Sequence, residues 1–404
     1  MEKKMQALRA LPTPCYVVDE EKLIENGKIL KGVASRTGAK VLLAQKAFST
    51  YSTYPLLAEF LDGTTASGLY EAKLGKEEFA NPYNAMHRET VYKETHVFSA
   101  AYKEQEMDEI IKYSDHIVFN SFAQFYRYRD KVMECNRNLK DGEHKKEMGI
   151  RVNPQFSTQE GHEIYDPCGY GSRLGVTLSE FEKNEKDLQG ISGLHFHTLC
   201  EQNSDDLYST LMEVEKKFGK YLSGMQWINF GGGHHVTRED YDIETLEKCI
   251  RFMQEKYDLT VYIEPGEAVA LNAGFLVAEV LDIVHNDIDI AILDTSAACH
   301  MPDVIEMPYQ PRITGASVQE DIGFKYPYRL GGPTCLAGDV IGDYFFEKEL
   351  KVGDKLIFHD MAIYSMVKNN TFNGMPLPSI YFIKKDGSTE LIRAFGYEDF
   401  KNRL

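Results

Sequence analysis

Five features follow or end runs of apolar residues in the first two thirds of the chain. Lys46 ends AKVLLAQK, Arg151 lies in MGIRVN, and His197 ends ISGLHFH. TVYIEP carries Glu264, and MQWINF is followed by a triplet of glycines, Gly231, Gly232 and Gly233. If these runs are the parallel strands of a barrel, their carboxyl ends share one face, so we expect the five features to converge on one site.

Together these residue types suit a phosphorylated aromatic aldehyde. The N–H groups of a glycine-rich loop bind phosphate, and a helix that begins near Thr237 would add its positive end. A desolvated amine at Lys46 can add to an aldehyde. Glu264 could keep a pyridine nitrogen protonated, and His197 offers a flat face for a ring. The combination predicts pyridoxal 5'-phosphate (PLP), joined covalently to Lys46.

Each feature alone also has a simpler explanation. A lysine at a strand end is commonly a solvated cap, His197 could be a hydrogen-bonded rim residue, and a glycine triplet is often only a turn. His195 and His197 also form an HxH motif, which could hold zinc in a metal-dependent barrel hydrolase. That hypothesis leaves Lys46 and the glycines without a role, so we expect no metal.

Eight short apolar runs rich in β-branched residues alternate with charged stretches of helical spacing, such as 67–79, 103–113 and 241–257. This order predicts an α/β fold, a (β/α)8 TIM barrel. An open, doubly wound sheet is the alternative, although its GxGxxG fingerprint is missing after the first strand. The expected strands span residues 39–46, 62–67, 95–100, 116–120, 148–153, 191–197, 225–230 and 260–265.

From about residue 275 the pattern changes to strand-like runs separated by Gly, Pro and Asp, without helical stretches between them. We expect a PLP-binding barrel over residues 13–275 and a C-terminal β-sheet or β-barrel domain over residues 276–404, joined by residues 1–12. The polar span 154–175 is the best candidate for a long functional loop.

The composition is that of an ordinary globular protein, with 404 residues of which 43% are hydrophobic and 26% charged. A net charge of −17 argues against nucleic acid or an anionic membrane as the partner, and leaves a cationic small molecule or plain solubility as explanations. Seven cysteines without a CxxC pair indicate reduced thiols. No signal segment or membrane helix is expected, and the predicted location is the cytoplasm.

Longer phrases resemble the fold-type III, PLP-dependent decarboxylases, which include ornithine and diaminopimelate decarboxylases, with alanine racemase more distant. The resemblance covers nearly the whole chain. GLHFHTLCEQ, NFGGGHHVT, IEPGEAV and CHMPDVIEMPYQP are most similar to the carboxynorspermidine/carboxyspermidine decarboxylases. The resemblance implies an alanine racemase-like barrel, PLP as the cofactor, and decarboxylation of carboxynorspermidine or carboxyspermidine in polyamine biosynthesis. Activity on diaminopimelate or ornithine is the alternative.

The resemblance also implies a role for each residue at the barrel rim. Lys46 would bind PLP covalently, His197 would stack on the ring, and Glu264 would hold the pyridine nitrogen. Arg151 would lie near the phenolic oxygen, and the glycines 231–233 would surround the phosphate. His234 and His235, which follow the glycines, could contact the phosphate as well.

In the second domain, GPTCLAGDVIG is similar to the cysteine loop of the family, so Cys335 would be the acid that protonates the α-carbon. AIYSMVKNNTFNGMP matches the loop in which Tyr364 reaches the phosphate, while Phe372 and Asn373 line the site. In this family the cysteine loop enters the active site of the partner subunit. The resemblance therefore implies an obligate homodimer with shared active sites.

The sequence departs from the family pattern in three places, of which the first two suit a substrate other than ornithine or diaminopimelate. Glu267 stands in EPGE where the amino-acid decarboxylases usually have EPGR, so it would orient a donor or face the substrate's amine. Leu336 replaces an acidic residue after the cysteine, and Glu71 is out of register with the acidic residue that follows strand two. Asp303 and Glu306 are candidate acceptors for the cationic groups of a carboxylated triamine.

A non-catalytic PLP carrier is a further alternative. Such proteins generally lack the second domain, whereas this chain has Cys335 and Tyr364 there. We therefore expect an enzyme that acts on a small cationic amino acid.

Overall fold

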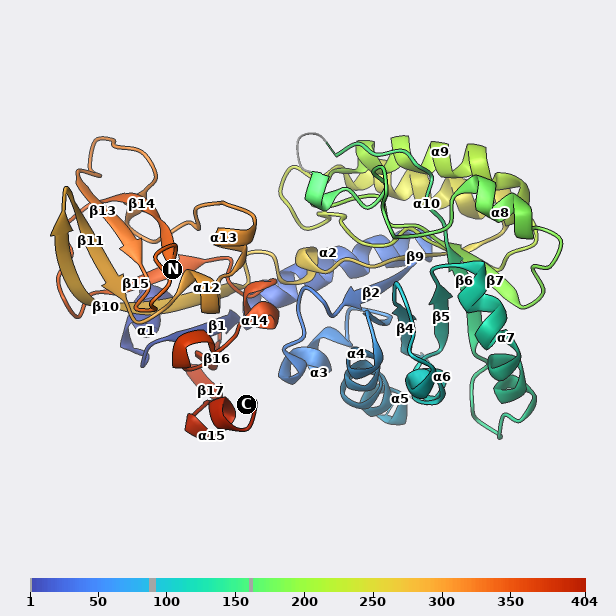
Figure 1. Cartoon of the computed structure of the whole chain (residues 1–404), viewed down its shortest axis with the longest axis horizontal. Coiled ribbons are helices and arrows are strands. Elements are labelled where there is room, and N and C mark those ends of the chain that lie inside the picture. Colours follow the sequence, from blue (N-terminus) through green and yellow to red (C-terminus); the bar gives the residue numbers. More distant parts are fainter. Residues whose placement is uncertain (1, 87–91, 160–162) are drawn as a thin grey trace. The chain divides into compact units, whose positions relative to one another are not determined.

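The computed structural model describes residues 2–86, 92–159 and 163–404, which form two compact units (Figure 1). The barrel unit consists of residues Asn26–Val269. The sheet unit consists of Met1–Glu25 together with Ala270–Leu404. Each unit has its own strands and its own core, so each is described by itself.

Eight parallel strands close into a barrel, which confirms the predicted (β/α)8 fold. The ring closes where β2 pairs with β9, with Lys40 opposite Tyr262. All eight expected strands are present, although each is shorter than its apolar run. They are β2 (Lys40–Ala44), β3 (Gly63–Ala66), β4 (Glu94–Phe98), β5 (His116–Phe119), β6 (Glu147–Arg151), β7 (Ile191–His195), β8 (Trp227–Asn229) and β9 (Thr260–Ile263).

Helices cover the outside of the barrel strands (Figure 1). The stretches 67–79, 103–113 and 241–257 form helical segments as predicted. Apart from short 3-10 turns, the described helices of this unit are α2 (Glu20–Thr37, which begins in the sheet unit), α3 (Tyr54–Leu57), α4 (Leu69–Leu74), a π-helical turn (Gly75–Ala80), α5 (Asn81–Met86), α6 (Met107–Tyr113), α7 (Phe122–Arg137), α8 (Leu178–Asn184), α9 (Ser204–Leu222), α10 (Ile243–Tyr257) and α11 (Glu267–Ala270).

The helix expected near Thr237 begins later, at Ile243. The side chain of Asp242 accepts a hydrogen bond from the N–H of Thr245, and such a cap fixes where a helix starts. The residues between the glycine triplet and α10 form turns instead. The positive end of a helix therefore does not follow the glycines directly.

The barrel interior is packed around Trp227, the single tryptophan of the chain. A Cβ atom on Gly193 would lie 2.0 Å from the Trp227 ring, and one on Gly149 would lie 2.3 Å from it. These two glycines let the indole cross the barrel beside Tyr262. A filled interior of this kind places the chemistry at the strand ends.

The sheet unit is built on a mixed sheet in which β10 is the longest strand. Its path runs β12-β14-β13-β11-β10-β1-β16-β17, and β15 also pairs with β10. The strands are β1 (Cys15–Asp19), β10 (Gly274–Asn286), β11 (Ile288–Leu293), β12 (Ala316–Ser317), β13 (Tyr326–Gly331), β14 (Val340–Phe346), β15 (Lys355–His359), β16 (Ser379–Ile383) and β17 (Thr389–Arg393). The helices are α1 (Glu2–Ala10), α12 (Ala297–His300), α13 (Asp303–Glu306), α14 (Ser365–Lys368) and α15 (Tyr397–Lys401).

Strand β1 was not among the expected strands. It lies between β10, to which it is antiparallel, and β16, to which it is parallel. All five of its residues are buried, so the chain segment before the barrel belongs to the sheet. The division between the units therefore falls after Glu25, whereas the sequence pattern suggests residue 13.

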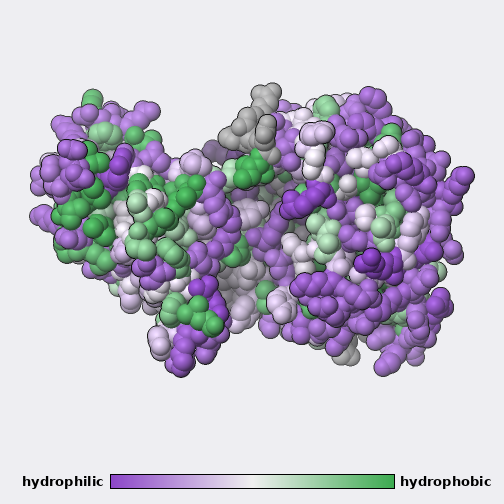
Figure 2. Space-filling model, in the orientation of Figure 1, coloured by the Kyte–Doolittle hydropathy of each residue, from purple (hydrophilic) through white to green (hydrophobic). Residues whose placement is uncertain are grey.

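Hydrophobic residues gather on the visible face of the sheet unit, whereas hydrophilic residues dominate the visible face of the barrel unit (Figure 2). Exposed apolar side chains on the strands of the sheet unit include Leu281, Val284 and Ile288. Within the described residues, no helix is long and apolar enough to cross a bilayer.

Candidate active site

Lys46 lies two residues beyond β2, at the carboxyl end of the barrel. Its side chain is exposed, which differs from the buried lysine expected from the sequence. Its pKa is nevertheless lowered, first because protein surrounds it and displaces water, and second because Arg151 is positively charged. Glu264 opposes this shift. Lys46 is thus reachable by a ligand while its amine holds a proton weakly.

Arg151 ends β6 and is buried. Burial lowers its pKa to about 10. Its guanidinium donates a hydrogen bond of 3.3 Å to the carbonyl of His197, and its central carbon lies 4.6 Å from the centre of the Phe98 ring. These contacts fix a cation beside Lys46 at the barrel rim.

His197 follows β7, and its ring stays neutral. Its Nδ1 accepts a hydrogen bond of 3.2 Å from the N–H of Gly232, which leaves the ring proton on Nε2. Its pKa is lowered well below the ordinary value by burial and by the charges of Lys46 and Arg151. A neutral, oriented imidazole is suited to lie against an aromatic ring.

The glycine triplet follows β8 in a conformation that requires glycine. The φ angles of Gly231 and Gly233 are +69° and +84°, and a Cβ atom on Gly231 would lie 2.5 Å from the carbonyl oxygen of Phe196. The N–H of Gly231 donates to Oδ1 of Asn229 at 2.8 Å. The N–H of Gly232 also has a protein acceptor, so two of the three N–H groups are already used.

Glu264 follows β9 and is buried. Nδ2 of Asn229 donates to its Oε1 at 2.8 Å, and Nε2 of His195 lies 3.4 Å from its Oε2. Burial raises the pKa of Glu264, but His195, His96 and Asn229 together lower it more, and the pKa is about 2. The site therefore holds an ionised carboxylate, as an anchor for a protonated pyridine nitrogen requires.

Glu267 begins α11 and lies 3.3 Å from Nε2 of His235. Glu201, which is exposed, completes a group whose ligand atoms lie within 4.8 Å of one another. Its three residues follow the ends of β7, β8 and β9, on the same rim as Lys46. This acidic group is suited to bind a cation.

In the sheet unit, Cys335 is exposed on the loop between β13 and β14. The buried carboxylate of Asp339 holds this loop, because Thr334 Oγ1 donates to it at 2.6 Å and Ser296 Oγ at 2.9 Å. Asp339 was not expected from the sequence. Its partner Ser296 lies 43 residues away along the chain, so no local pattern could reveal the contact.

The loop that carries Tyr364 and Phe372 joins the same group of loops. Sγ of Cys299 lies 3.5 Å from the carbonyl oxygen of Phe372, and Nδ2 of Asn370 donates to the carbonyl of Ala298 at 2.8 Å. Tyr364 has a positive φ of 53°, which is rare for a side chain of its size. The sheet unit thus gathers the loops of Cys335 and Phe372 around residues 295–300.

Asp303 and Glu306, at the two ends of α13, share one cation. Lys368 forms ion pairs with both carboxylates, at 2.7 Å to Glu306. Lys368 ends α14, four residues after Tyr364. The two predicted substrate acceptors are therefore close together, with part of their charge already balanced.

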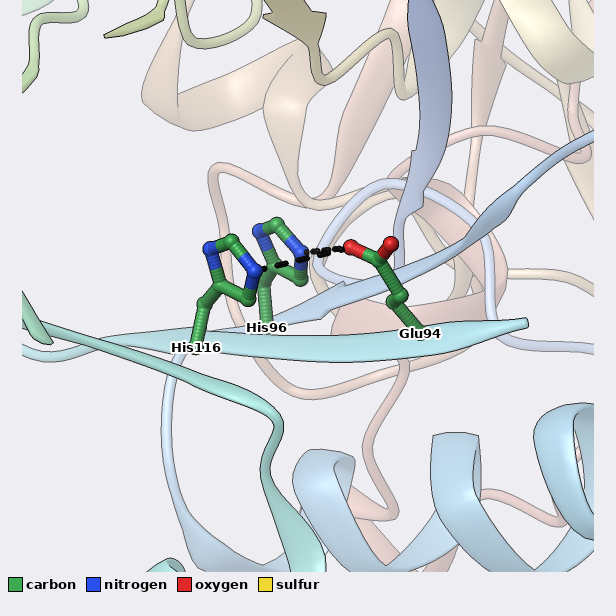
Figure 3. Close-up of side chains that lie close together, drawn as sticks. All are labelled: Glu94, His96 and His116. Carbon is green, nitrogen blue, oxygen red and sulfur yellow. Dashed lines mark hydrogen bonds and ion pairs between the residues drawn. The ribbon is translucent and has the colours of Figure 1, made fainter. Parts of the chain in front are cut away.

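A further group, Glu94, His96 and His116, lies inside the barrel (Figure 3). Nε2 of His96 and of His116 lie 2.8 and 3.7 Å from Oε2 of Glu94. The imidazole rings are nearly parallel, with 9° between their planes and 3.9 Å between their centres, so their lone pairs do not converge on one ion. Lys40 also pairs with Glu94. This geometry favours a buried hydrogen-bonded group over a metal centre.

The HxH motif does not join such a group either. Nε2 of His195 faces Glu264, and Nδ1 of His197 accepts from Gly232. Among the described residues, no third acidic, histidine or cysteine side chain completes a metal-ligating set with these two histidines. The geometry therefore gives no support to the zinc hydrolase hypothesis.

Residues 15–362 match the family model described as "Pyridoxal-dependent decarboxylase, C-terminal sheet domain". The chain belongs to the pyridoxal-dependent decarboxylases. It is 43% identical over 402 residues, 97% of this chain and 98% of the relative, to a carboxynorspermidine/carboxyspermidine decarboxylase of Campylobacter jejuni. It is 41% identical over 98% of its length, and 96% of the relative, to a carboxyaminopropylagmatine decarboxylase of Synechocystis.

Solved structures agree with this membership. The chain matches a carboxynorspermidine decarboxylase of Campylobacter jejuni, crystallised with norspermidine, with a TM-score of 0.86 and 42% identity. The match covers 98% of this chain and all of that one. This decarboxylase is therefore a carboxy-lyase that uses PLP, and its accessible Lys46 amine and ionised Glu264 carboxylate fit that cofactor.

Proposed function

We propose that the decarboxylase converts carboxynorspermidine and carboxyspermidine to norspermidine and spermidine in polyamine biosynthesis. The observation that carries the proposal is the 43% identity to an enzyme named for both substrates, over almost the full length of both chains. Diaminopimelate decarboxylases are more distant, at 27% identity over 56% of this chain. The first two departures from the family pattern, at Glu267 and Leu336, agree with a substrate other than diaminopimelate.

Each residue at the barrel rim would have one task toward PLP. Lys46 would bind it covalently, His197 would stack on its ring, and Glu264 would pair with its protonated nitrogen. Arg151 would lie near its phenolic oxygen. The phosphate would lie at the glycine loop. The N–H groups of Gly231 and Gly232 already donate to protein atoms, so Gly233 would supply its N–H to the phosphate. Tyr364 would add a hydroxyl. PLP, when bound, withdraws the electron pair that remains when CO2 departs.

Cys335 would finish the reaction. Loss of CO2 leaves an electron pair on the α-carbon, and the Cys335 thiol would donate its proton there, which forms the C–H bond of the product amine. The thiolate would regain a proton from water before the next substrate binds. Asp339 would keep the loop in position for this transfer.

Glu267 would bind a cationic group of the substrate, with Glu201 and His235 beside it. Phe372, exposed at 45%, would cover the methylene groups, and Asp303 and Glu306 would receive the more distant cation. A carboxylated triamine has cationic nitrogens spaced along its chain, so acceptors at separate places suit it.

A cytoplasmic homodimer with shared active sites would complete the enzyme. Cys335 has an apolar neighbour, Leu336, which is 43% exposed. The loop that contacts Cys299 adds the exposed ring of Phe372. Exposed apolar side chains around a reactive residue are typical of a surface that becomes covered. A second copy of the chain is the proposed cover.

Decarboxylation of carboxyaminopropylagmatine is the second candidate, because the Synechocystis relative is nearly as similar. The two substrate types differ at the far end, where agmatine carries a planar guanidinium and the triamine a compact ammonium. A guanidinium needs paired acceptors in one plane, whereas an ammonium can donate to acceptors in a less regular arrangement.

The test is CO2 release from a panel of substrates under identical conditions. Carboxynorspermidine, carboxyspermidine, carboxyaminopropylagmatine, diaminopimelate and ornithine are compared by kcat/KM. The proposal expects the first two to lead by at least ~10-fold, a difference of about 1.4 kcal/mol. A higher kcat/KM for carboxyaminopropylagmatine would select the second candidate. The Lys46→Ala variant serves as the blank.

A further inference from the structure

Asn229 is a fully buried side chain that uses both ends of its amide. Its Nδ2 donates to Oε1 of Glu264 at 2.8 Å, and its Oδ1 accepts from the N–H of Gly231 at 2.8 Å. An amide can donate at one end and accept at the other without carrying a charge. Asn229 therefore links the carboxylate after β9 to the glycine loop after β8.

His195 approaches the second oxygen of the same carboxylate from the neighbouring strand. It stands opposite Asn229 in the parallel pairing of β7 and β8, and its Nε2 lies 3.4 Å from Oε2 of Glu264. Its ring lies parallel to that of Phe98, with an interplanar angle of 18°. Burial lowers the pKa of His195 in spite of the nearby carboxylate, so the neutral ring donates its Nε2 proton.

The two donors leave room for a third contact. A carboxylate offers about four acceptor positions, and Asn229 and His195 use one on each oxygen. Glu264 can still accept a hydrogen bond from a ring N–H above it. His195, the first histidine of the HxH motif, thereby has a function that requires no metal.

We propose that Asn229 and His195 are positioning residues that hold the Glu264 carboxylate ionised and fix its distance from the glycine loop. The cofactor's ring-nitrogen anchor and its phosphate loop are then parts of one rigid unit. This inference rests on the proposed role of Glu264 toward PLP. It adds two residues that would act on the cofactor through Glu264 and Gly231.

The physical consequence concerns both ends of the cofactor. Without the two donors, the effect of burial on Glu264 is opposed mainly by the more distant His96, and burial favours the protonated acid, which cannot accept the ring proton. Without Asn229, the N–H of Gly231 also loses its acceptor. Removal of either residue should therefore weaken PLP binding and change the absorbance of the bound cofactor.

The experiment compares His195→Leu, His195→Gln and Asn229→Leu with the unchanged protein. Apoenzyme is titrated with PLP, and the dissociation constant and the absorbance spectrum of the bound cofactor are measured, besides the thermal midpoint of the apoenzyme. We expect the dissociation constant to rise roughly 10-fold or more in the two leucine variants, the scale of a lost hydrogen bond to a charged group. His195→Gln keeps an N–H donor and should restore most of the affinity.

Ser192→Ala is the matched control. Ser192 lies on the same strand as His195, and its Oγ donates to the carbonyl of Met148 at 3.1 Å, away from Glu264. Its removal should alter the thermal midpoint without changing the PLP dissociation constant. If Asn229→Leu does not fold, the comparison of leucine with glutamine at position 195 still decides the matter.

A second set of variants in the Glu264→Gln background separates the possible failures. If Asn229 and His195 act through Glu264, their leucine variants add little once Glu264 is neutral. Additive losses in that background would overturn the inference, as would unchanged PLP binding by His195→Leu and Asn229→Leu in the native background. If Glu264→Gln itself leaves PLP binding and absorbance unchanged, the proposed role of Glu264 fails, and the inference fails with it.

Discussion

Lys46 has an accessible amine whose pKa lies below the ordinary value of 10.5, because surrounding protein displaces its water and because Arg151 is cationic. Only the neutral amine attacks an aldehyde, so a lowered pKa enlarges the reactive fraction near neutral pH. We expect the rate of PLP attachment to apoenzyme to rise with pH and to level off below pH 10.5. Stopped-flow absorbance across the neutral and alkaline range measures this rate.

Arg151→Gln provides the check on the cause. Loss of the nearby positive charge makes protonation of Lys46 easier, so the same rise should occur at higher pH. Arg129→Gln, which removes an arginine paired with Asp187 on the surface, should leave the profile in place. Identical profiles for all three proteins would contradict the electrostatic explanation.

Replacement of Lys46 by alanine tests the covalent role itself. We expect the variant to lose the yellow absorbance band, and borohydride followed by mass spectrometry to detect no PLP adduct, since no other amine has this position. Lys103→Ala, which removes an exposed lysine paired with Glu106, should label as the unchanged protein does. An adduct on the Lys46→Ala variant would refute the assignment.

Glu267→Gln tests the acidic group at the rim. Loss of one charge-assisted contact to a substrate cation should raise KM for carboxynorspermidine by about 10-fold, with a smaller change in kcat. Glu244→Gln is the control, because Glu244 pairs with Lys248 on an exposed helix surface. A loss of PLP affinity instead would mean that Glu267 orients His235 toward the phosphate.

The barrel positions the site through the pairing register of its neighbouring strands. The strands pair in parallel around the ring, so residues that end or follow neighbouring strands reach the same face. Arg151, His195 and Asn229 are consecutive register partners across β6, β7 and β8. The glycine loop then starts two residues above Asn229, which is why one amide can reach both the loop and Glu264.

The loop of Cys335 depends on Asp339, at the entry to β14. Asp339→Ala should lower kcat for CO2 release by roughly 10-fold, because Thr334 and Ser296 lose a shared buried acceptor and the loop loosens. The PLP dissociation constant should change little, since the main PLP contacts are assigned to the barrel unit. CO2 release and PLP titration on the same preparation measure both effects.

Asp343→Ala is the matched control for this prediction. Asp343 lies within β14, and its carboxylate pairs with Arg329 at 2.7 Å on the surface. Exposed pairs contribute little to stability, so kcat should be close to that of the unchanged protein. An equal loss in both variants would indicate a general effect on β14 and not on the cysteine loop.

If two subunits share each active site, a mixture of two inactive variants should regain activity in the mixed dimers. Lys46→Ala and Cys335→Ala would each be inactive alone. A mixture refolded from equal amounts should regain about a quarter of the activity, since half of the dimers are mixed and one site in each mixed dimer is intact. CO2 release before and after subunit exchange measures the gain.

The control for this experiment is a mixture in which both defects lie in one chain. The double variant, mixed with Lys46→Ala, offers no subunit with an intact lysine and should stay inactive. If the first mixture also stays inactive while mixed dimers are demonstrated by mass spectrometry, Lys46 and Cys335 act within one chain. That result would remove the shared site from the proposal.

Much of the molecule follows from the sequence because local patterns carry it. The alternation of apolar runs with helical stretches predicted all eight barrel strands, and residue types at the strand ends indicated Lys46, Arg151, His197 and Glu264 as one group. The phrases around them indicated the decarboxylase family. The start of a helix and one strand were predicted less well. The helix expected near Thr237 begins later, and strand β1 was not predicted.

Contacts between distant residues needed the tertiary structure. Asn229 and Glu264 are 35 residues apart, His195 and Glu264 are 69 apart, and Ser296 and Asp339 are 43 apart. Periodicity describes which side a residue faces, but it does not say which side chain of another strand it meets. The sequence by itself thus determined the barrel and the residues at its rim, whereas only the folded chain decided which neighbours hold them and set their charge.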